Sequence, residues 1–366
     1  MTRIVGLVVE GADVSLTFTD GKRRVLAAVW LRDACRCPEC RDPATEIRRE
    51  GLPLLDPDLT VAHAWIDHDG HGLGCRWHDG HETSLHAEWL QAGTVPDQQP
   101  GARRFWGSEL EPFTAEYPDL DETRLLEWLS LLWRDGVARI RGMPATRDEL
   151  RSFAGRIGPI RASNYGPDWA IEASPDPFSP VDSTQGLRVH VDLPYRELPP
   201  GIQFNLAART DATGGESTVT DGFAVVAALR EQDPDAFAAL TTARYSTHWR
   251  SPTHDLTWSG PVVELDADGE PRLIRHAPGL AGDVAGDPDT TRRAYRALNL
   301  FTEMTNDPRF RATVALREGD LLAMHNHRVL HGRRSVDLST GGRTLLGCYL
   351  DVDDLLSTIR VLAGRG

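Results

Sequence analysis

The sequence has few cysteines, no excess of basic residues and no long apolar run. Its formal charge is −14 over 366 residues, so no net positive field would attract a phosphate backbone, and we expect no nucleic-acid partner. No apolar stretch approaches the roughly 18–20 residues of a membrane-spanning helix, so we expect no membrane span. The first residues, MTRIVGLVVEGADVSLTF, have no apolar core followed by a small-residue cleavage site. We therefore expect no secretory signal and a cytoplasmic protein.

Three of the five cysteines, Cys35, Cys37 and Cys40, lie within six residues in a C-x-C-x-x-C arrangement. An odd, clustered set favours a reducing compartment and metal ligation over a disulfide framework. Three thiolates on one turn suit tetrahedral zinc, which needs a fourth ligand from elsewhere. The alternative is that these cysteines pack as small hydrophobic side chains.

The segment CRWHDGHETSLH offers several candidates for the fourth ligand, and its spacing does not choose among them. They are Cys75, His78, His81 and His86. A zinc ion with four protein ligands has no open coordination position, so such a site would be structural.

The length favours two domains, and the composition, 40% hydrophobic and 26% charged, is sufficient for a sizeable core. Residues 1–95 read as a small β-rich module, with strands over 14–34 joined by the hairpin signal Asp20-Gly21. The stretch PDQQPGARR (96–104) is rich in proline, glycine and glutamine and predicts a linker. The remaining residues, 105–366, form the larger domain.

The larger domain alternates many short strands with a few helices. The leucine spacing of DETRLLEWLSLLWRDG predicts a helix over 121–136, and Thr146 with Glu149 has the spacing of a capping box. Further predicted elements are strands at 136–142 and 343–352 and helices at 224–232 and 291–305. This order favours a β-sandwich or barrel-like catalytic domain over a doubly wound sheet.

The stretch LRVHVDLPY places His190 and Asp192 two residues apart in a strand-like run, where they would face the same side. Alone, this pair is more simply explained as solvated polar residues. A triad for non-haem Fe(II) needs one more histidine. HGRRS (331–335) supplies His331, and twelve residues later Arg343 begins a strand-like segment, where a guanidinium can clamp a carboxylate. Alone, Arg343 would be a surface salt-bridge residue.

These motifs resemble those of the Fe(II)/2-oxoglutarate oxygenases of the taurine dioxygenase type. With WLRDACRCPEC, YGPDW (165–169), PPGIQFNLA (199–207) and TGGESTVTDGF (213–223), the chain resembles the γ-butyrobetaine dioxygenase-like group over nearly its whole length. The resemblance implies a double-stranded β-helix (jelly-roll) oxygenase domain, an N-terminal zinc-binding domain, and a homodimer. It also implies 2-oxoglutarate as co-substrate, O2 as oxidant and structural Zn(II).

The resemblance also implies roles for individual residues. His190, Asp192 and His331 fall on the Fe(II) ligands, Arg343 on the residue that binds the distal carboxylate of 2-oxoglutarate, and Ser217 on a small hydroxyl near that co-substrate. Cys35, Cys37, Cys40 and His81 fall on the zinc ligands. His325, His327 and Cys348 acquire no such role and are interpreted as packing or solvent-facing residues.

The resemblance further implies an aromatic cage for a quaternary ammonium, with Tyr165, Trp169 and Tyr349 on three cage positions. Without it, these rings would be ordinary core aromatics. The remaining cage position is Asp182, whose carboxylate attracts a cation by charge instead. Arg275 and His276 replace two asparagines that hold the substrate carboxylate and would suit a more strongly anionic group.

The sequence therefore predicts an enzyme that hydroxylates a small zwitterionic amine, a trimethylammonium carboxylate or phosphonate, and releases succinate and CO2. One alternative is the same chemistry on an amino acid or a natural-product intermediate. Alternatives outside this class are a zinc-dependent hydrolase that uses His190, Asp192 and His331, and a non-catalytic zinc module. Arg343 argues against the hydrolase, which needs no second carboxylate clamp.

Overall fold

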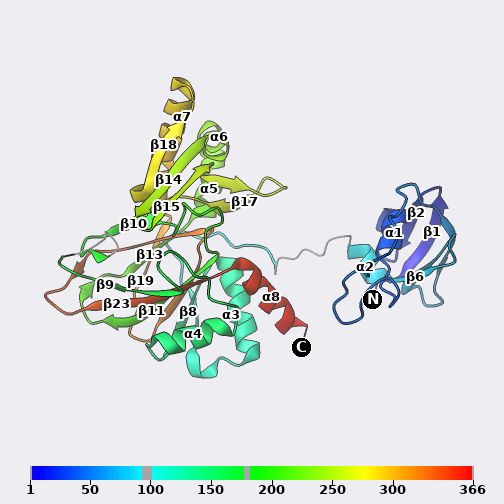
Figure 1. Cartoon of the computed structure of the whole chain (residues 1–366), viewed down its shortest axis with the longest axis horizontal. Coiled ribbons are helices and arrows are strands. Elements are labelled where there is room, and N and C mark those ends of the chain that lie inside the picture. The colour runs from blue at the N-terminus through cyan, green and yellow to red at the C-terminus, as the bar shows by residue number, and fades with distance from the viewer. Residues whose placement is uncertain (1, 93–100, 177–181, 365–366) are drawn as a thin grey trace. The chain divides into compact units, whose positions relative to one another are not determined.

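A computed structural model describes residues 2–92, 101–176 and 182–364 of the chain. It divides into two compact units, Met1–Gln98 and Gln99–Gly366 (Figure 1). Residues 96–100 of the predicted linker lie outside the described residues, as does the predicted boundary at residue 95. No helix in the described ranges is both long and apolar enough to cross a membrane.

The first unit contains two three-stranded antiparallel sheets, ordered β1-β2-β3 and β4-β5-β6. Its elements are β1 (Ile4–Glu10), β2 (Asp13–Phe18), β3 (Arg23–Ala27), α1 (Ala28–Asp33), β4 (Val61–Ile66), β5 (Gly72–Trp77), β6 (Glu82–His86) and α2 (Ala87–Ala92). Apolar residues from both sheets form one core.

The hairpin predicted at Asp20-Gly21 is confirmed, since β2 pairs with β3 and Gly21 has φ +83°. The prediction of strand through residue 34 is wrong, because β3 ends at Ala27 and the chain continues as α1. Ala28 and Leu31 are buried there at helical spacing. Packing of that face therefore overrides the strand preference of the sequence VWL.

The second unit consists mainly of strands. They are β7 (Phe113–Glu116), β8 (Val137–Arg141), β9 (Asp168–Glu172), β10 (Leu187–His190), β11 (Ile202–Thr210), β12 (Thr213–Gly214), β13 (Ser217–Asp221), β14 (Arg244–Ser251), β15 (His254–Gly260), β16 (Val263–Leu265), β17 (Pro271–Ile274), β18 (Ala281–Ala285), β19 (Arg311–Val314), β20 (Leu321–His325), β21 (Val329–Arg333), β22 (Val336–Asp337) and β23 (Arg343–Leu350).

The helices of this unit are α3 (Glu122–Asp135), α4 (Arg147–Gly155), α5 (Gly222–Gln232), α6 (Pro234–Thr242), α7 (Pro288–Asn306) and α8 (Val352–Ala363), with short 3-10 turns η1 (Tyr117–Asp119) and η3 (Pro278–Leu280). The helices predicted near 121–136, 224–232 and 291–305 are confirmed. The predicted capping box is confirmed in part, because Thr146 Oγ1 accepts a hydrogen bond from the Glu149 N–H at the start of α4. The expectation of a mainly β protein with a few helices is correct.

Two sheets carry the site. One has six strands in the order β7-β8-β20-β11-β23-β9, and the other has four in the order β10-β21-β13-β19. Residues from both sheets, including Leu322, Met324 and Val219, form a shared apolar cluster, so the sheets pack face to face. Helices α3, α4 and α8 cover the outer face of the six-stranded sheet (Figure 1).

Alternation along the strands decides which residues point between the sheets. On β11, Phe204 and Leu206 join the core beneath the helices, so Gln203 and Asn205 face the other way. On the neighbouring β23, Leu346, Cys348 and Leu350 join that same core. The odd-numbered residues of β23, from Arg343 to Tyr349, therefore face the four-stranded sheet.

Candidate active site

His190, Asp192 and His331 come together between the two sheets. Their ligand atoms all lie within 4.8 Å of one another. His190 and His331 are directly opposite partners on the antiparallel strands β10 and β21. Asp192 Oδ1 lies 3.4 Å from His190 Nε2 and 3.6 Å from His331 Nε2. Three donor atoms from two chain segments thus converge on one point.

Asp192 lies just beyond the end of β10, so the pair is not held by strand geometry alone. The side chain of Asn326 braces this turn: its Oδ1 accepts from the Asp192 N–H at 2.8 Å, and its Nδ2 donates to the Asp192 carbonyl at 3.0 Å. The next residue, Leu193, has φ +53°, a conformation that non-glycine residues seldom adopt outside constrained sites. Sequence reasoning missed Asn326, which lies between the two histidines set aside as packing residues.

The ionisation of His331 and Asp192 suits metal binding, whereas at His190 a metal ion would compete with a proton, because the pKa of that imidazole is raised. Burial lowers the pKa of His331 to about 4, so its imidazole is neutral at pH 7. Burial would raise the pKa of Asp192, but the charges of His331 and His190 hold it below its usual value. For His190, burial would lower the pKa, and the hydrogen bond and charge of Asp192 outweigh that effect. Neutral imidazole and carboxylate are the forms that bind metals.

The donor set fits Fe(II). Two imidazoles and one carboxylate on one side of a metal are typical of non-haem Fe(II) oxygenases, which keep the other positions open. His190 Nδ1 lies 3.0 Å from the carbonyl oxygen of Arg188, to which it can donate, leaving Nε2 to face the centre. Such a bond fixes both the tautomer and the ring orientation of a metal-binding histidine.

Arg343 and the triad line one cavity. The arginine is 6% exposed, and its Nε donates to the carbonyl oxygen of Gly215 at 2.9 Å. Burial lowers the pKa of Arg343 to about 10, and the charge of the nearby Arg333 acts in the same direction. The guanidinium therefore remains positively charged at neutral pH and presents a buried cation to the cavity.

Other polar residues of this cavity were not all predicted. Ser217, the first residue of β13, lines this cavity together with Arg343. Gln203, Asn205 and Arg333 line it as well and were missed. The two amides are buried, with Gln203 Nε2 donating to Asn205 Oδ1 at 3.3 Å. Their i, i+2 spacing on β11 was the signal that could have revealed them.

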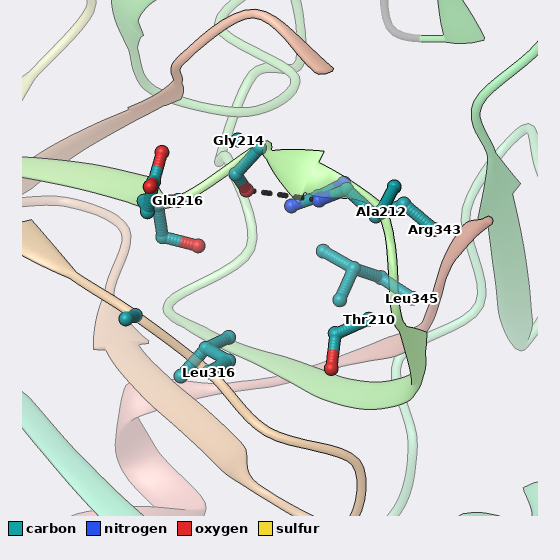
Figure 2. Close-up of a pocket in the computed structure, with 10 residues that line it drawn as sticks. Thr210, Ala212, Gly214, Glu216, Leu316, Arg343 and Leu345 are labelled. Carbon is teal, nitrogen blue, oxygen red and sulfur yellow. Dashed lines mark hydrogen bonds between the residues drawn. The ribbon is translucent and has the colours of Figure 1, made fainter. Parts of the chain in front are cut away.

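A second cavity adjoins Arg343, as Figure 2 shows. Ser217, Arg343 and Leu345 border both cavities. Figure 2 labels Thr210, Ala212 and Glu216 among the residues around this second cavity, which contains none of the three triad residues. Arg343 thus stands between the triad cavity and this neighbouring space.

The aromatic residues predicted as a cage lie in two contacting groups. The rings of Trp169 and Tyr349 are 4.1 Å apart between centroids. Tyr165, half exposed, lies 5.6 Å from Trp249, which stacks on Tyr195 at 5.8 Å. Trp249 and Tyr195 were missed because they come from β14 and from the turn after Asp192. The hydroxyl of Tyr349 donates to Asp192 Oδ2 at 2.6 Å.

Asp182 is half-buried, and its carbonyl oxygen accepts a hydrogen bond from the N–H of Ser174. Burial lowers the pKa of Arg333, and the charge of Asp182 partly opposes that effect. Asp182 is therefore close enough to interact electrostatically with one of the cationic residues of the triad cavity.

Arg275 and His276 do not form the anion site expected for them. The guanidinium of Arg275 donates from Nε to Glu264 Oε1 at 2.8 Å, and its Nη atoms donate to the backbone carbonyls of Pro194, Arg196 and Glu197. The expectation that Arg275 binds an anionic group of the substrate is therefore corrected, because its N–H groups already bond acceptors within the protein. Burial lowers the pKa of His276 to about 3, so its ring is neutral and attracts no anion by charge.

The first unit contains the second cluster of potential metal ligands. Cys35, Cys37, Cys40 and His81 place one ligand atom each within 4.8 Å of the others. The Nε2 atom of His81 lies 3.2, 3.7 and 3.6 Å from the three sulfurs in that order. Three thiols and one imidazole are a donor set typical of structural zinc.

The other candidates for the fourth ligand lie outside this cluster. Cys75 is fully buried in the core of the first unit. His78 Nε2 lies 3.1 Å from the hydroxyl of Thr60, and His86 is exposed on β6. The geometry thus agrees with His81, which the resemblance selected.

The histidines and cysteine left without a role pack as interpreted. His325 is buried, with its ring 5.5 Å from Trp133. His327 Nε2 lies 2.9 Å from the carbonyl oxygen of Pro199. Cys348 is fully buried in the core beneath the helices.

Two family models match the chain. The model described as "Taurine catabolism dioxygenase TauD, TfdA family" matches residues 97–349. The model described as "Gamma-butyrobetaine hydroxylase-like, N-terminal" matches residues 7–91. Together they support the resemblance inferred from the motifs.

Curated relatives align over nearly the whole chain. A γ-butyrobetaine dioxygenase from Pseudomonas sp. (strain AK-1) is 36% identical, covering 95% of this chain and 93% of the relative. The γ-butyrobetaine dioxygenase of Homo sapiens is 28% identical, with 96% and 95% covered. A mitochondrial trimethyllysine dioxygenase from Rattus norvegicus is 30% identical, with 91% and 82% covered.

Among solved structures, a taurine dioxygenase from Burkholderia xenovorans superposes with a TM-score of 0.52 at 18% identity, covering 67% of this chain and 89% of that one. This similarity concerns the fold alone. It supports the arrangement of strands around the two sheets that hold the triad.

Proposed function

This chain belongs to the taurine catabolism dioxygenase TauD, TfdA family, and from that premise we propose that it hydroxylates a small zwitterionic amine. It is a 2-oxoglutarate-dependent dioxygenase, and its cofactor and co-substrate are Fe(II) and 2-oxoglutarate. In this chemistry one oxygen atom of O2 enters succinate, formed with CO2 from 2-oxoglutarate, and the other becomes the hydroxyl of the product. Family membership decides against the zinc hydrolase and the non-catalytic zinc module.

One observation carries the assignment of the site: the triad and a buried arginine line a single cavity. In this proposal His190 Nε2, Asp192 Oδ1 and His331 Nε2 hold Fe(II), which supplies the activation of O2 when bound. Arg343 binds the distal carboxylate of 2-oxoglutarate, and Ser217 lies beside it. The chain's contribution is to position these groups around one partly buried cavity.

Aromatic side chains support an ammonium group on the substrate. Tyr349 bonds Asp192 and Trp169 packs against Tyr349, and ring faces attract a cation without hydrogen bonds. Tyr165 and Trp249 extend the aromatic surface. The relatives named as γ-butyrobetaine and trimethyllysine dioxygenases act, by their names, on trimethylammonium compounds. We therefore propose a γ-butyrobetaine-like substrate, with a carboxylate or phosphonate at its other end.

A second candidate function is the same hydroxylation of a different amine, and Asp182 is the residue that favours it. A carboxylate accepts hydrogen bonds from a primary ammonium, whereas a quaternary ammonium has no N–H to donate. An amino acid or a natural-product intermediate would satisfy such a group better than a trimethylammonium compound.

A substrate screen separates the two candidates. The enzyme, loaded with Fe(II), is incubated with 2-oxoglutarate, O2 and one amine at a time, and succinate and the hydroxylated product are quantified by mass spectrometry. γ-Butyrobetaine and trimethylammonium phosphonates are compared with the corresponding primary amines. Product from the quaternary compounds supports the first proposal, whereas clear preference for the primary amines supports the second and contradicts the first.

The remaining proposals concern architecture. We propose that Cys35, Cys37, Cys40 and His81 hold a structural zinc ion, that residues 1–95 form its domain, and that residues 105–366 form a double-stranded β-helix. The donor set of the cluster and the two facing sheets support these assignments. A homodimer and a cytoplasmic location are proposed from the resemblance and, for the location, from the free clustered thiols.

A further inference from the structure

The carboxylate of Asp192 is held at one oxygen and directed at the triad with the other. Oδ2 accepts a hydrogen bond of 2.6 Å from the hydroxyl of Tyr349. Oδ1 is the oxygen that lies 3.4 and 3.6 Å from the Nε2 atoms of His190 and His331. The two oxygens therefore have different partners.

From this division we propose that Tyr349 is a positioning residue of the metal centre, which fixes the rotation of the Asp192 carboxylate so that Oδ1 faces Fe(II). This inference rests on the proposed function of the triad. It assigns to Tyr349 a role for its hydroxyl, whereas the aromatic cage inferred from the sequence uses only its ring.

The position of Tyr349 is itself fixed, so it can restrict the movement of another side chain. It is 3% exposed and belongs to β23, where it pairs with Gln203 on β11. Its carbonyl oxygen accepts from the Arg161 N–H at 2.8 Å, and its ring packs against Trp169. With strand pairing and ring packing both fixed, the hydroxyl has one position relative to the sheet.

Asp192 needs such a partner because its contacts with Asn326 are made by its backbone and leave Oδ2 without support. The contacts of Asn326 with Asp192 involve only the N–H and carbonyl of Asp192. They fix the backbone there but leave the carboxylate free to rotate about its last torsion. Within the described ranges, Tyr349 donates a hydrogen bond to that carboxylate, and the triad histidines lie near its other oxygen. Groups that bond the outer atom of a metal ligand commonly change metal affinity by about 10–100-fold when removed.

Tyr349→Phe tests the inference because it removes the hydroxyl and keeps the ring. Fe(II) is titrated anaerobically into the zinc-loaded protein at saturating 2-oxoglutarate, and binding is followed by the visible absorption of the chelated metal. We expect affinity to fall about 10–100-fold, while the KM for the substrate changes little because phenylalanine still presents a ring face.

The matched control is Tyr245→Phe. Tyr245 is also buried, and its hydroxyl donates to the carbonyl oxygen of Ala294 at 3.0 Å, away from the triad cavity. This variant should bind Fe(II) as the natural chain does. A second test places Tyr349→Phe in an Asp192→Ala background, where its effect on Fe(II) affinity should disappear because the carboxylate it acts through is gone.

The outcomes separate this inference from the function it rests on. If the natural chain binds Fe(II) and forms succinate but Tyr349→Phe binds Fe(II) equally well, the positioning role is wrong and the proposed function stands. An equal loss of affinity in the presence and absence of Asp192 also overturns the positioning role. Failure of the natural chain to bind Fe(II) overturns both.

Discussion

Arg343 donates from Nε to the carbonyl oxygen of Gly215 at 2.9 Å, and its two terminal nitrogens have no hydrogen-bond partner among the described residues. The backbone thus fixes the guanidinium at one edge and leaves its other edge for a ligand. Gly215 suits this contact, since a Cβ there would lie 2.7 Å from Arg343 Cδ. The pair presents a pre-oriented, two-pronged cation to the triad cavity, as binding of a carboxylate requires.

Arg343→Ala is expected to raise the KM for 2-oxoglutarate by about 10–150-fold, since hydrogen bonds to charged groups contribute about 1.5–3 kcal/mol. Arg343→Lys keeps the charge but loses the paired geometry, so its KM should lie between the two. Steady-state assays of succinate formation measure both. Arg209→Ala is the control, because Arg209 is exposed and paired with Asp211. A KM unchanged in Arg343→Ala would remove the assignment of the co-substrate carboxylate.

Trp169 lies over Gly347 on the neighbouring strand, and a Cβ at residue 347 would come within 2.5 Å of its indole ring. Gly347→Ala should therefore displace the indole and raise the KM for a quaternary ammonium substrate by several fold. Loss of one cation–π contact of about 0.5–2 kcal/mol corresponds to such a change. Indole fluorescence and the KM are measured together. Gly155→Ala, which has open space around its new Cβ, should alter neither, and an unchanged KM in Gly347→Ala would contradict the aromatic site.

Removal of zinc should change which cysteines react. In the zinc-loaded chain we expect no alkylation by iodoacetamide, because zinc protects Cys35, Cys37 and Cys40 and burial protects the other two. Burial also raises the pKa of Cys75 and of Cys348 to about 12, so both remain thiols.

After chelation, mass spectrometry should find label on the three clustered cysteines and none on Cys75 or Cys348 while the fold persists. Denaturation, as the control, should expose all five. Labelling of the cluster at full rate before chelation would show that no metal protects it.

Glu264 and Arg275 form a pair whose effect on stability depends on pH. Burial would raise the pKa of Glu264, but the neighbouring Arg275 and Arg272 lower it below its ordinary value of 4.5. Since the folded pKa is lowered, the ionised carboxylate stabilises the fold above that value, and this contribution is lost as pH falls through the folded pKa.

Glu264→Gln should therefore lower the free energy of unfolding by about 1–3 kcal/mol at pH 7, as expected for a hydrogen bond between a partly buried carboxylate and a buried guanidinium. The difference from the natural chain should shrink as pH falls below 4.5. Urea unfolding at several pH values measures it, and Asp211→Asn, in an exposed pair, is the control. A difference that stays constant with pH would contradict the charged pair and reopen a ligand-binding role for Arg275.

The sequence predicted that His190, Asp192 and His331 come together, but it did not predict the residues that surround them. His190, Asp192 and His331 could be grouped because their motif carries the chemistry, yet their closeness depends on β10 pairing with β21 in one register. No local pattern contains that pairing, which joins segments about 140 residues apart. Asn326 was missed for the same reason, since its contacts with Asp192 are made only in the folded chain.

Arg275 is a case in which the sequence suggested a ligand-binding role that the fold does not support. As a charged residue in a strand-like run it suggested a ligand, but the fold surrounds it with Glu264 and three backbone carbonyls. At Ala28–Asp33 the β-rich sequence VWL forms a helix because burial of Ala28 and Leu31 outweighs local preference. In both places the deciding interactions come from residues distant in the sequence.

The most direct test of the account is the conversion of 2-oxoglutarate to succinate by the purified chain with Fe(II) and O2. The account predicts succinate and CO2 in equal amounts, dependence on Fe(II), stimulation by a small zwitterionic amine, and at least a hundredfold loss in His190→Ala. Succinate formation that persists unchanged in His190→Ala, or its absence from the Fe(II)-loaded natural chain with every amine tested, would contradict it.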